Sequence, residues 1–491
     1  MVQGVSSDAG KSLIATALCR WLRRRGALVA PFKAQNMSNN ARVVDGGEIG
    51  TAQWLQALAA GVAADVRMNP VLLKPEADTR SQVVVNGVVS RELTQSPWRG
   101  RSTRLWPHVQ AAYRSLAADY DVVVVEGAGS PAETNLWADD IVNMRVAELA
   151  GAPVLLVADI DRGGAFAHLY GTWALLPPPW RSRICGFLLN KFRGDEGLLA
   201  PAPAELERAT GVPTVGVVPW IEHALPDEEG PTLGTPRGRS RRVCIVGGPY
   251  ASNLDEFVRL QQVADVRWAR TPDALAGTDL VVLPGSKHVA NDLAWMRSGG
   301  MADAVISAAA SGLPVLGICG GLQMLGGTID DPAGVEGSAE GLDLLPVVTS
   351  YLPGKTTKRT AVRFGRLPPT WSWLDSRSFD GYEIHHGTAT VSGSVEAIVG
   401  DGLGYADGNL LGIYAHGLFE SDEVLDAYTG IVPPPLDATF EQLADLIDAH
   451  LDIAWLARCL DLPALLERST RAARPPRGCS ESDGPVSGYG L

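Results

Sequence analysis

The sequence predicts an α/β fold in which a linker separates two series of buried parallel strands. Short, nearly continuous apolar runs such as "DVVVVEGAG" and "APVLLVADID" alternate with helical patterns along the chain. The length of 491 residues is too great for one ordinary hydrophobic core, and about 150 residues per domain suggests two to four domains. The stretch "EEGPTLGTPRGRSRR" is rich in Gly, Pro and Arg and lacks an apolar period, so we interpret it as the linker.

The composition is that of a folded protein, with 46% hydrophobic and 20% charged residues. No apolar run approaches the roughly 18 residues of a membrane-spanning helix, and the N-terminus lacks a signal-peptide pattern, so we expect a cytoplasmic protein without membrane contacts. A net charge of −13 argues against nucleic acid as a partner, although local basic patches could bind an acidic small molecule. The six cysteines lack C-x-x-C spacing, so any cysteine chemistry must rest on one thiol.

The first expected element is a very short strand that leads through "GVSSDAGKS" into a helix. In such a loop, backbone N–H groups and the helix N-terminus face an anion, Lys11 reaches the terminal phosphates, and Ser12 can ligate Mg²⁺. The spacing is nonstandard, because five residues separate Gly4 from Gly10 where the usual motif has four. We assign Asp8, Gly10, Lys11 and Ser12 to an ATP site.

The helix that follows is expected over residues 11–25, with one apolar stripe along its length. Three arginines, at positions 23–25, crowd its last turn, where cations suit the helix dipole. We interpret this arginine run as a solvated helix end.

Polar residues at later strand ends are candidates for the same site. Glu126 follows four valines and precedes Gly-Ala-Gly, so it could hold Mg²⁺, orient a reactant, or simply be solvated. Asp45 in "VDGGEIG" is a second possible metal ligand, although an acidic turn residue is the commoner outcome. Asn190 ends another strand and could bind an adenine edge or cap a turn.

The second series of strands contains "PVLGICGG", where G-x-C-x-G has the form of a nucleophile elbow. A tight strand-to-helix turn would lift Cys319 from the sheet, and the helix N-terminus would favour the thiolate. The N–H of Gly320 could form half of an oxyanion hole, with the other half from the loop at Gly285. The alternative is a small apolar core residue.

A thiolate needs a proton partner, and His416 in "GIYAHGLFE" is the best candidate because it follows a short apolar run. His385 and His386, in "GYEIHHG", are rivals. Spacing alone leaves the choice among these three open.

Together these stretches resemble the cobyric acid synthase family, the glutamine-dependent amidotransferases of adenosylcobalamin biosynthesis. The resemblance extends to about residue 430 and rests on long, unusual motifs, among them "QGVSSDAGKS", "PFKAQNMSNN", "LVADIDRGGAFAHLYGT", "GICGGLQMLG" and "YAHGLFE". It implies a P-loop parallel-sheet domain similar to dethiobiotin synthetase, followed by an α/β domain of the class I glutamine amidotransferase type.

The domain boundaries that we expect from this resemblance and from composition fall into five parts. They are a synthetase domain at 1–228, a linker at 229–242, a glutaminase domain at 243–435, a C-terminal helical segment at 436–469, and a disordered tail at 470–491.

The resemblance also implies an activity: amidation of four peripheral carboxylates of adenosylcobyrinic acid a,c-diamide, with glutamine, ATP and Mg²⁺. Cys319 would form a glutamyl thioester and His416 would be its base. Asp45 and Glu126 look like the Mg²⁺ ligands of the dethiobiotin synthetase relatives, beside the phosphate loop. The oligomeric state is not predicted.

The corrinoid substrate is a large polycarboxylate, so basic residues in the shared motifs are reasonable contacts. The candidates are Lys33, Lys74, Arg80 and Arg162, with surface solvation as the alternative for each.

One departure concerns the base. Ordinary class I glutaminases carry a Glu two residues after the His, where this chain has Leu418. Another group must therefore orient His416, and Glu420 is a candidate.

Two other functions compete with this interpretation. One is cobyrinic acid a,c-diamide synthase, which the "FKAQNM" and "DGGEIG" stretches disfavour. The other is a P-loop ATPase with a non-catalytic glutaminase-like module, against which the intact Cys319 and His416 count.

Overall fold

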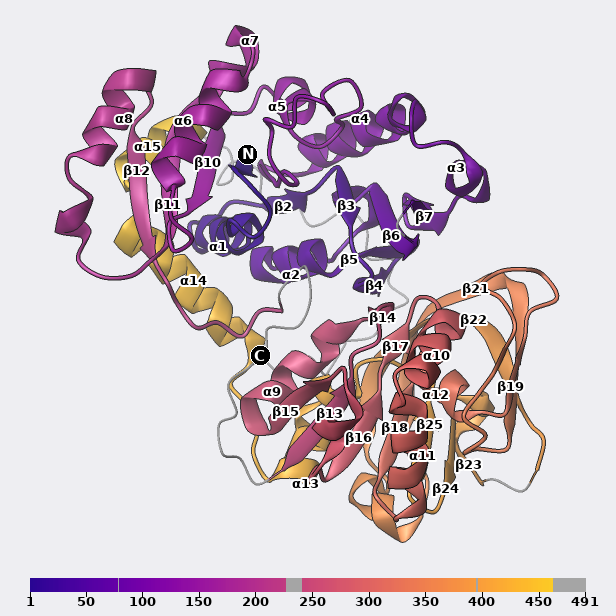
Figure 1. The fold of residues 1–491 in the computed structure, drawn as a ribbon. Coiled ribbons are helices and arrows are strands. Elements are labelled where there is room, and N and C mark those ends of the chain that lie inside the picture. Colours follow the sequence, from indigo (N-terminus) through magenta and orange to yellow (C-terminus); the bar gives the residue numbers. More distant parts are fainter. Residues whose placement is uncertain (78, 227–240, 394–395, 462–491) are drawn as a thin grey trace.

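The computed structural model describes residues 1–77, 79–226, 241–393 and 396–461. Two α/β units follow one another: a first unit that ends by residue 226, and a second unit from residue 241 to about 430 (Figure 1). This confirms the predicted fold class. The predicted tail and all but the last two residues of the predicted linker lie outside the described residues. Within the described part of the chain, no helix is both long and apolar enough to span a membrane.

The first unit is built on a parallel sheet. Its four central strands lie in the order β1-β10-β11-β12, and β9 with its partner β2 continues the sheet because Glu126, directly after β9, bridges Val2. The strands are β1 (Val2–Gly4), β2 (Val29–Phe32), β9 (Val122–Val125), β10 (Val154–Asp159), β11 (Ile184–Phe192) and β12 (Thr214–Pro219). The carboxyl ends of β1 and β9 therefore meet at one edge, where parallel sheets place their binding sites.

Helices cover this sheet, and a smaller mixed sheet and a hairpin extend it toward the second unit. The helices are α1 (Lys11–Arg24), α2 (Thr51–Ala60), α3 (Arg91–Gln95), α4 (Arg101–Asp119), α5 (Met144–Ala150), α6 (Ala165–Leu175), α7 (Pro178–Arg181) and α8 (Ala202–Thr210). The smaller sheet has β3 (Gln35–Met37), β6 (Val71–Ala77), β7 (Arg80–Val85) and β8 (Val88–Val89), and the hairpin has β4 (Ala41–Val44) and β5 (Gly47–Gly50).

The second unit contains a seven-stranded sheet in the order β15-β13-β16-β18-β25-β24-β23, in which the last two strands are antiparallel. Its strands are β13 (Arg242–Val246), β15 (Asp265–Ala269), β16 (Leu280–Leu283), β18 (Val315–Ile318), β23 (Glu396–Val399), β24 (Gly404–Asp407) and β25 (Leu410–Ile413). Its helices are α9 (Val258–Val263), α10 (Val289–Ser298), α11 (Met301–Ala310), α12 (Gly320–Leu325) and α13 (Asp422–Thr429).

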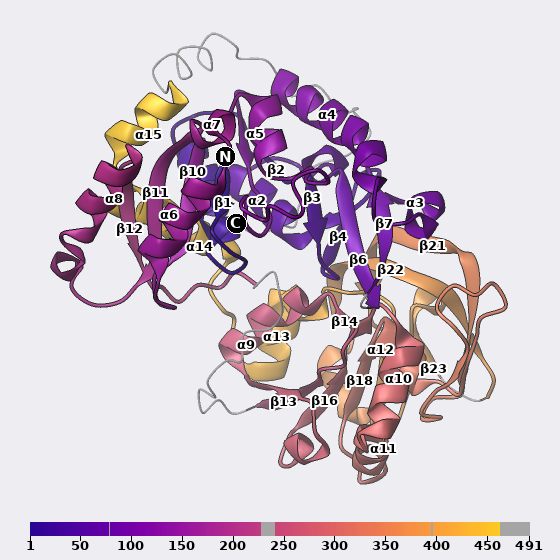
Figure 2. The ribbon, with the colours of Figure 1, turned by 45° about the horizontal axis from the view of Figure 1, so that its top comes forward.

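Two further sheets of the second unit face the first unit. One pairs β14 (Ala251–Ser252) with β17 (Gly285–Ser286); the other contains β19 (Thr328–Asp330), β20 (Ala339–Glu340), β21 (Val347–Arg363) and β22 (Ser378–Val391). The β4–β5 hairpin packs on β21, and β4 also contacts β22, as Figures 1 and 2 show from two directions.

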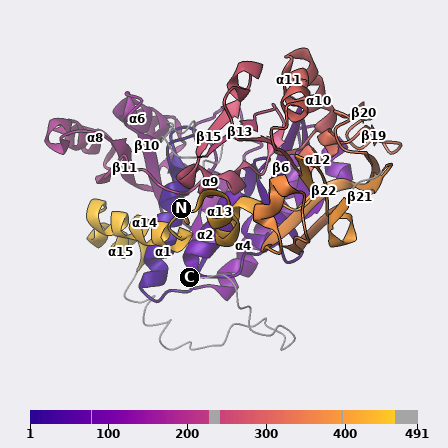
Figure 3. The same cartoon turned by 90° about the horizontal axis from the view of Figure 1, so that it is seen from below.

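The chain then returns to the first unit. Helices α14 (Leu436–His450) and α15 (Ile453–Leu460) lie beside α1 and the β11–β12 side of the first sheet (Figure 3). Carboxylates of α14 bind the end of α1: Arg24 pairs with Asp445 and Arg25 with Asp448, each at 2.6 Å. The arginines at this helix end are exposed or partly exposed, as a solvated helix end requires, but Arg24 and Arg25 also pair with carboxylates more than 400 residues later in the chain, which the sequence pattern did not indicate.

Candidate active site

Cys319 is the single residue between the end of β18 and the start of α12. Its backbone has φ 53° and ψ −107°, a conformation that residues other than glycine rarely adopt. The neighbouring glycines are required by close packing: a Cβ on Gly321 would lie 2.0 Å from the carbonyl oxygen of Leu283, and one on Gly317 would lie 2.5 Å from that of Gly321. The turn has the strained geometry that the G-x-C-x-G pattern predicts.

His416 follows β25 and is fully buried beside Cys319. Its Nδ1 lies 2.9 Å from Oε1 of Glu256, whose other oxygen accepts the backbone N–H of Gly417 at 3.0 Å. Burial alone would lower the pKa of His416, but the Cys319 thiolate and the Glu256 carboxylate outweigh it and raise this pKa to about 10. Cys319, His416 and Glu256 thus form a chain of three groups, as in other nucleophile–base–carboxylate sites.

Glu256 was not among the residues that the sequence suggested. The candidate for its role, Glu420, instead binds Arg42, at 2.9 Å between Oε2 and Nη1. Glu256 lies in a short 3₁₀ turn within "SNLDEF", which has no spacing relation to His416. Only the packing of that turn against the loop after β25 reveals its role.

The two rival histidines have other partners. His385 bonds Glu383 at 3.1 Å and stacks on the ring of Tyr414 at 4.2 Å. Burial lowers the pKa of His386 to about 4, and its Nδ1 lies 3.3 Å from the carbonyl oxygen of Gly354. Both line the cavity beside Cys319, and the Glu383 partner of His385 is itself buried, but His416 is the one of the three histidines that is in hydrogen-bond contact with the Cys319 thiol.

The cavity beside Cys319 has walls from both units. Asn39 and Lys74 come from the first unit, and the second unit supplies the rest, including Ser286, Lys287, Gln323, Tyr351 and Lys355. The two residues expected to form the oxyanion hole lie in neighbouring segments: the backbone nitrogen of Ser286, next to Gly285, would be 2.8 Å from a Cβ on Gly320. Both segments therefore border the space beside the thiol.

Buried ion pairs lie at the boundary between the two units, near this cavity. Glu48 of the first unit binds Lys74 on its own side and Lys355 of the second unit. Burial lowers the pKa of Lys74 to about 7, although Glu48 opposes this. Lys74, which the sequence suggested as a substrate contact, is therefore not solvated: it is buried, paired with Glu48, and lines the Cys319 cavity.

The phosphate loop brings together most of the predicted nucleotide-site residues. The Lys11 ammonium donates to the carbonyl oxygens of Ser6 at 3.0 Å and Gly129 at 3.4 Å. Ser12 Oγ donates to Oε1 of Glu126 at 2.8 Å.

Glu126 is fully buried and also accepts from Lys33 at 2.9 Å and from Gln56 at 2.5 Å. Lys33, another suggested substrate contact, is thus held in a buried ion pair beside the phosphate loop.

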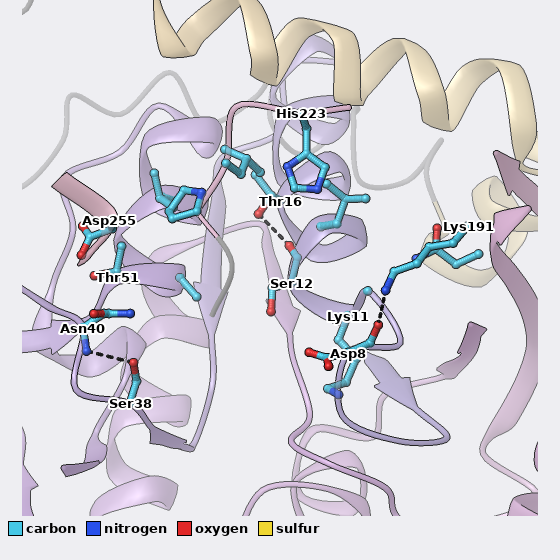
Figure 4. Close-up of a pocket in the computed structure, with 17 residues that line it drawn as sticks. Asp8, Lys11, Ser12, Thr16, Ser38, Asn40, Thr51, Lys191, His223 and Asp255 are labelled. Atoms are coloured by element: carbon cyan, nitrogen blue, oxygen red, sulfur yellow. Dashed lines mark hydrogen bonds between the residues drawn. The ribbon is translucent and has the colours of Figure 1, made fainter. Parts of the chain in front are cut away.

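A cavity of about 150 Å³ extends from this loop to the second unit (Figure 4). Asp8 and Lys11 lie at one end of it, and Asn40 and Asp255 at the other. Asn190 lines it too, packed so closely that a Cβ on Gly10 would lie 2.0 Å from its Nδ2.

Asn190 Nδ2 donates to the carbonyl oxygen of Ala9 at 2.9 Å, while its Oδ1 is buried without a hydrogen-bond partner among the described residues.

Two predicted site residues, Asp45 and Arg80, lie away from both cavities, whereas Arg162 pairs with Asp8 at the end of the cavity near Lys11. Asp45 is exposed at the tip of the β4–β5 hairpin, bridged to Asp65, and does not line the cavity beside Lys11. Arg80 and Arg162 are exposed, and their partners are Glu76 at 3.1 Å and Asp8 at 3.0 Å. Across the described ranges, no three His, Cys, Asp or Glu side chains cluster as metal ligands.

The chain matches two protein-family models. Residues 1–231 match the CobQ/CobB/MinD/ParA nucleotide binding domain, and residues 242–424 match the CobB/CobQ-like glutamine amidotransferase domain. The cobyric acid synthase of Variovorax paradoxus (strain S110) is 56% identical over 468 residues, which cover 93% of this chain and 98% of that relative. The cobyric acid synthase of Paracidovorax citrulli (strain AAC00-1) is 56% identical over 482 residues, with 93% of this chain and 98% of the relative covered.

Proposed function

This chain belongs to the cobyric acid synthase family, and we propose that it amidates peripheral carboxylates of a corrinoid with ammonia taken from glutamine. It is a glutamine-hydrolysing ligase of cobalamin biosynthesis with a nucleotide-binding unit. The observation that carries the proposal is the wall of the Cys319 cavity, part of which comes from the first unit. Ammonia released there is formed at the boundary with the unit that binds the nucleotide. The cytoplasmic location expected from the sequence stays a prediction.

In the second unit, the Cys319 thiolate attacks the amide carbonyl carbon of glutamine, and the segments at Gly285 and Gly320 stabilise the oxyanion. His416 gives its proton to the departing nitrogen, so that ammonia leaves and a glutamyl thioester remains on Cys319. Water, deprotonated by His416, then cleaves the thioester to glutamate. Glu256 engages Nδ1 of His416 throughout, which fixes the ring orientation.

In the first unit, the loop before α1 holds the phosphates of ATP, with Asp8, Gly10, Lys11 and Ser12 beside them. A substrate carboxylate attacks the terminal phosphorus, giving an acyl phosphate and ADP. Ammonia then displaces phosphate from the acyl carbon and forms the amide. The unpartnered Oδ1 of Asn190 fits the amino group of an adenine.

Ser12, which lines the cavity beside Lys11, would offer its hydroxyl oxygen to a Mg²⁺ ion that completes its shell with phosphates and water. Glu126 is buried and its oxygens accept from Ser12, Lys33 and Gln56, so it would have to exchange these donors to bind the ion directly. When bound, the ion would neutralise charge on the transferred phosphoryl group. Lys33 adds a positive charge at the same place. Asp45 has no part in this proposal.

For the corrinoid, the exposed guanidinium of Arg162, at the cavity end marked by Asp8, is the candidate side chain best placed to meet a carboxylate. Arg80 is equally accessible but lies on the smaller sheet, paired with Glu76.

Mass spectrometry of the products from purified enzyme, ATP, glutamine and adenosylcobyrinic acid a,c-diamide tests the proposal. We expect the mass to fall by four carboxylate-to-amide conversions, since each replaces an OH group by the slightly lighter NH2 group. No change with the a,c-diamide, but two added amides with the corrinoid that lacks them, would identify an a,c-diamide synthase. ATP hydrolysis without any amidation of either corrinoid would identify an ATPase with a glutaminase-like module.

A further inference from the structure

One buried segment of the second unit, Asn253–Glu256, is held by the first unit. The backbone N–H of Ala41 donates to Oδ1 of Asn253 at 3.1 Å, and Oδ1 of Asn40 accepts the N–H of Leu254 at 3.0 Å. Both partners belong to the β4 region of the first unit. The segment is therefore fixed across the boundary by backbone as well as side-chain groups.

The same segment supports the proposed catalytic base on its other side. Glu256 bonds Nδ1 of His416, and Nδ2 of Asn253 lies 3.0 Å from Nε2 of that ring. Asn253 has φ 55°, a left-handed conformation that asparagine tolerates better than most residues. The contacts on both sides over-determine this conformation. Any shift of the segment moves groups that touch both nitrogens of His416.

The third contact from the first unit is Arg42, which is buried at the boundary. It binds Asp255, within the segment, and both oxygens of Glu420, in the loop that follows His416. Burial would lower the pKa of Arg42, but these two carboxylates hold it well above its ordinary value. Arg42 is thus the cation shared by the buried carboxylate of Asp255 and the partly exposed carboxylate of Glu420, which lie on two segments that adjoin His416.

Arg42 also reaches His416 through an aromatic ring. Its guanidinium lies 5.0 Å from the ring of Tyr382, which stacks on the His416 imidazole at 5.2 Å between centroids and 22° between planes. Tyr382 and His416 exchange backbone hydrogen bonds of 2.9 and 3.2 Å. The Tyr382 ring that stacks on His416 is therefore itself in contact with the Arg42 guanidinium.

We propose that Arg42 of the first unit is a positioning residue for glutamine hydrolysis in the second unit, acting on His416 through Asp255, Glu420 and Tyr382. The inference rests on the proposed role of His416. Without the guanidinium, the buried Asp255 and the partly exposed Glu420 lose the cation between them, and the segment and the loop move apart. A displacement of a catalytic group by about 1 Å lowers a rate about a hundredfold.

Arg42→Gln in the full-length enzyme tests this by comparing two nitrogen sources. We expect kcat for glutamine hydrolysis to fall at least about tenfold with little change in KM, since the base is misplaced but the glutamine cavity remains. Amidation supported by ammonium chloride, which needs no His416, should persist. Arg42→Lys, which keeps the charge but loses the fork, should restore part of the glutamine rate.

Arg20→Gln is the matched control. Arg20 is equally buried and binds two carboxylates, Asp437 and Glu441, but between α1 and α14. A general loss of stability would lower the glutamine and ammonium rates together in both variants. If Arg42→Gln lowers the glutamine-dependent and ammonium-dependent rates by the same factor, so that their ratio is unchanged, the inference is overturned.

Cys319→Ala, assayed in the same series, separates this inference from the proposed function. If Cys319→Ala still hydrolyses glutamine, the proposed function itself fails. If it does not, and Arg42→Gln behaves like the wild type, only the role of Arg42 is wrong.

Discussion

At the scale of one residue, the backbone of Cys319 is held in a strained conformation at the position proposed for the nucleophile. Its φ and ψ lie in a region that costs about 1–3 kcal/mol for a residue with a Cβ. The turn is tightly packed on both sides, since a Cβ on Gly321 would meet Leu283 and one on Gly320 would meet Ser286. The strain is compatible with a stable protein because the surrounding sheet enforces it.

Cys319→Gly should therefore be more stable than Cys319→Ala, although both lose the thiol. We expect a difference of about 1 kcal/mol, because glycine adopts this conformation without a Cβ clash but loses more entropy on folding. The midpoint of thermal unfolding, read from a signal in the second unit, measures it. A lower midpoint for Cys319→Gly would contradict the strain assigned to this turn.

Glu256 and His416 lead to a prediction about pH. In the wild type, the pKa of His416 is raised to about 10, so the ring keeps its proton at neutral pH and loses it as the pH rises through that value. Glu256→Gln removes one of the two negative charges that raise this pKa, so the pKa should fall. The alkaline inflection in kcat/KM for glutamine should move to lower pH. An inflection at the wild-type position would exclude Glu256 as the carboxylate that stabilises the imidazolium.

At the scale of elements, helix α14, which follows the second unit in sequence, packs against α1, the first helix of the chain. Leu443 of α14 is fully buried in the same hydrophobic cluster as Ile14 and Trp21 of α1. Trp21 also donates its indole N–H to Asp448 at 2.7 Å. The C-terminal helices thus stabilise the phosphate-loop helix, although they follow the glutaminase unit in sequence.

Leu443→Ala should destabilise the first unit by about 2–5 kcal/mol through the cavity it leaves. Hydrogen exchange should then accelerate in α1 and leave the β18–α12 region unchanged. Leu425→Ala in α13, equally buried in a core cluster of the second unit, is the matched control and should give the reverse pattern. Faster exchange in both units from either substitution would contradict the assignment of α14 to the first unit.

Local patterns predicted those elements whose cause is local. The glycine bracket of Cys319, the Gly-Lys-Ser loop and the apolar run before Glu126 each specify their own turn or strand. Glu256 and Arg42 could not be found in this way, because their roles depend on contacts between segments 160 and 378 residues apart. The sequence suggests Lys33 and Lys74 as substrate contacts or solvated side chains, but only the fold shows that each is held in a buried ion pair.

At the scale of the whole molecule, the two proposed sites share a boundary rather than a common pocket. The Cys319 cavity takes part of its wall from the first unit, and the cavity beside Lys11 takes Asp255 from the second. The segment Asn253–Glu256 lies between them and contacts His416. A change at either site therefore has a direct physical connection to the other.

We propose that the two units divide the reaction: Cys319 and His416 release ammonia, and the unit around Lys11 consumes it. The most direct test measures glutamine hydrolysis and corrinoid amidation in parallel for Cys319→Ala and Lys11→Ala. We predict that Cys319→Ala amidates the corrinoid with ammonium but not with glutamine, while Lys11→Ala retains basal glutamine hydrolysis and amidates with neither nitrogen source. Glutamine-dependent amidation by Cys319→Ala, or full amidation by Lys11→Ala, would contradict the account.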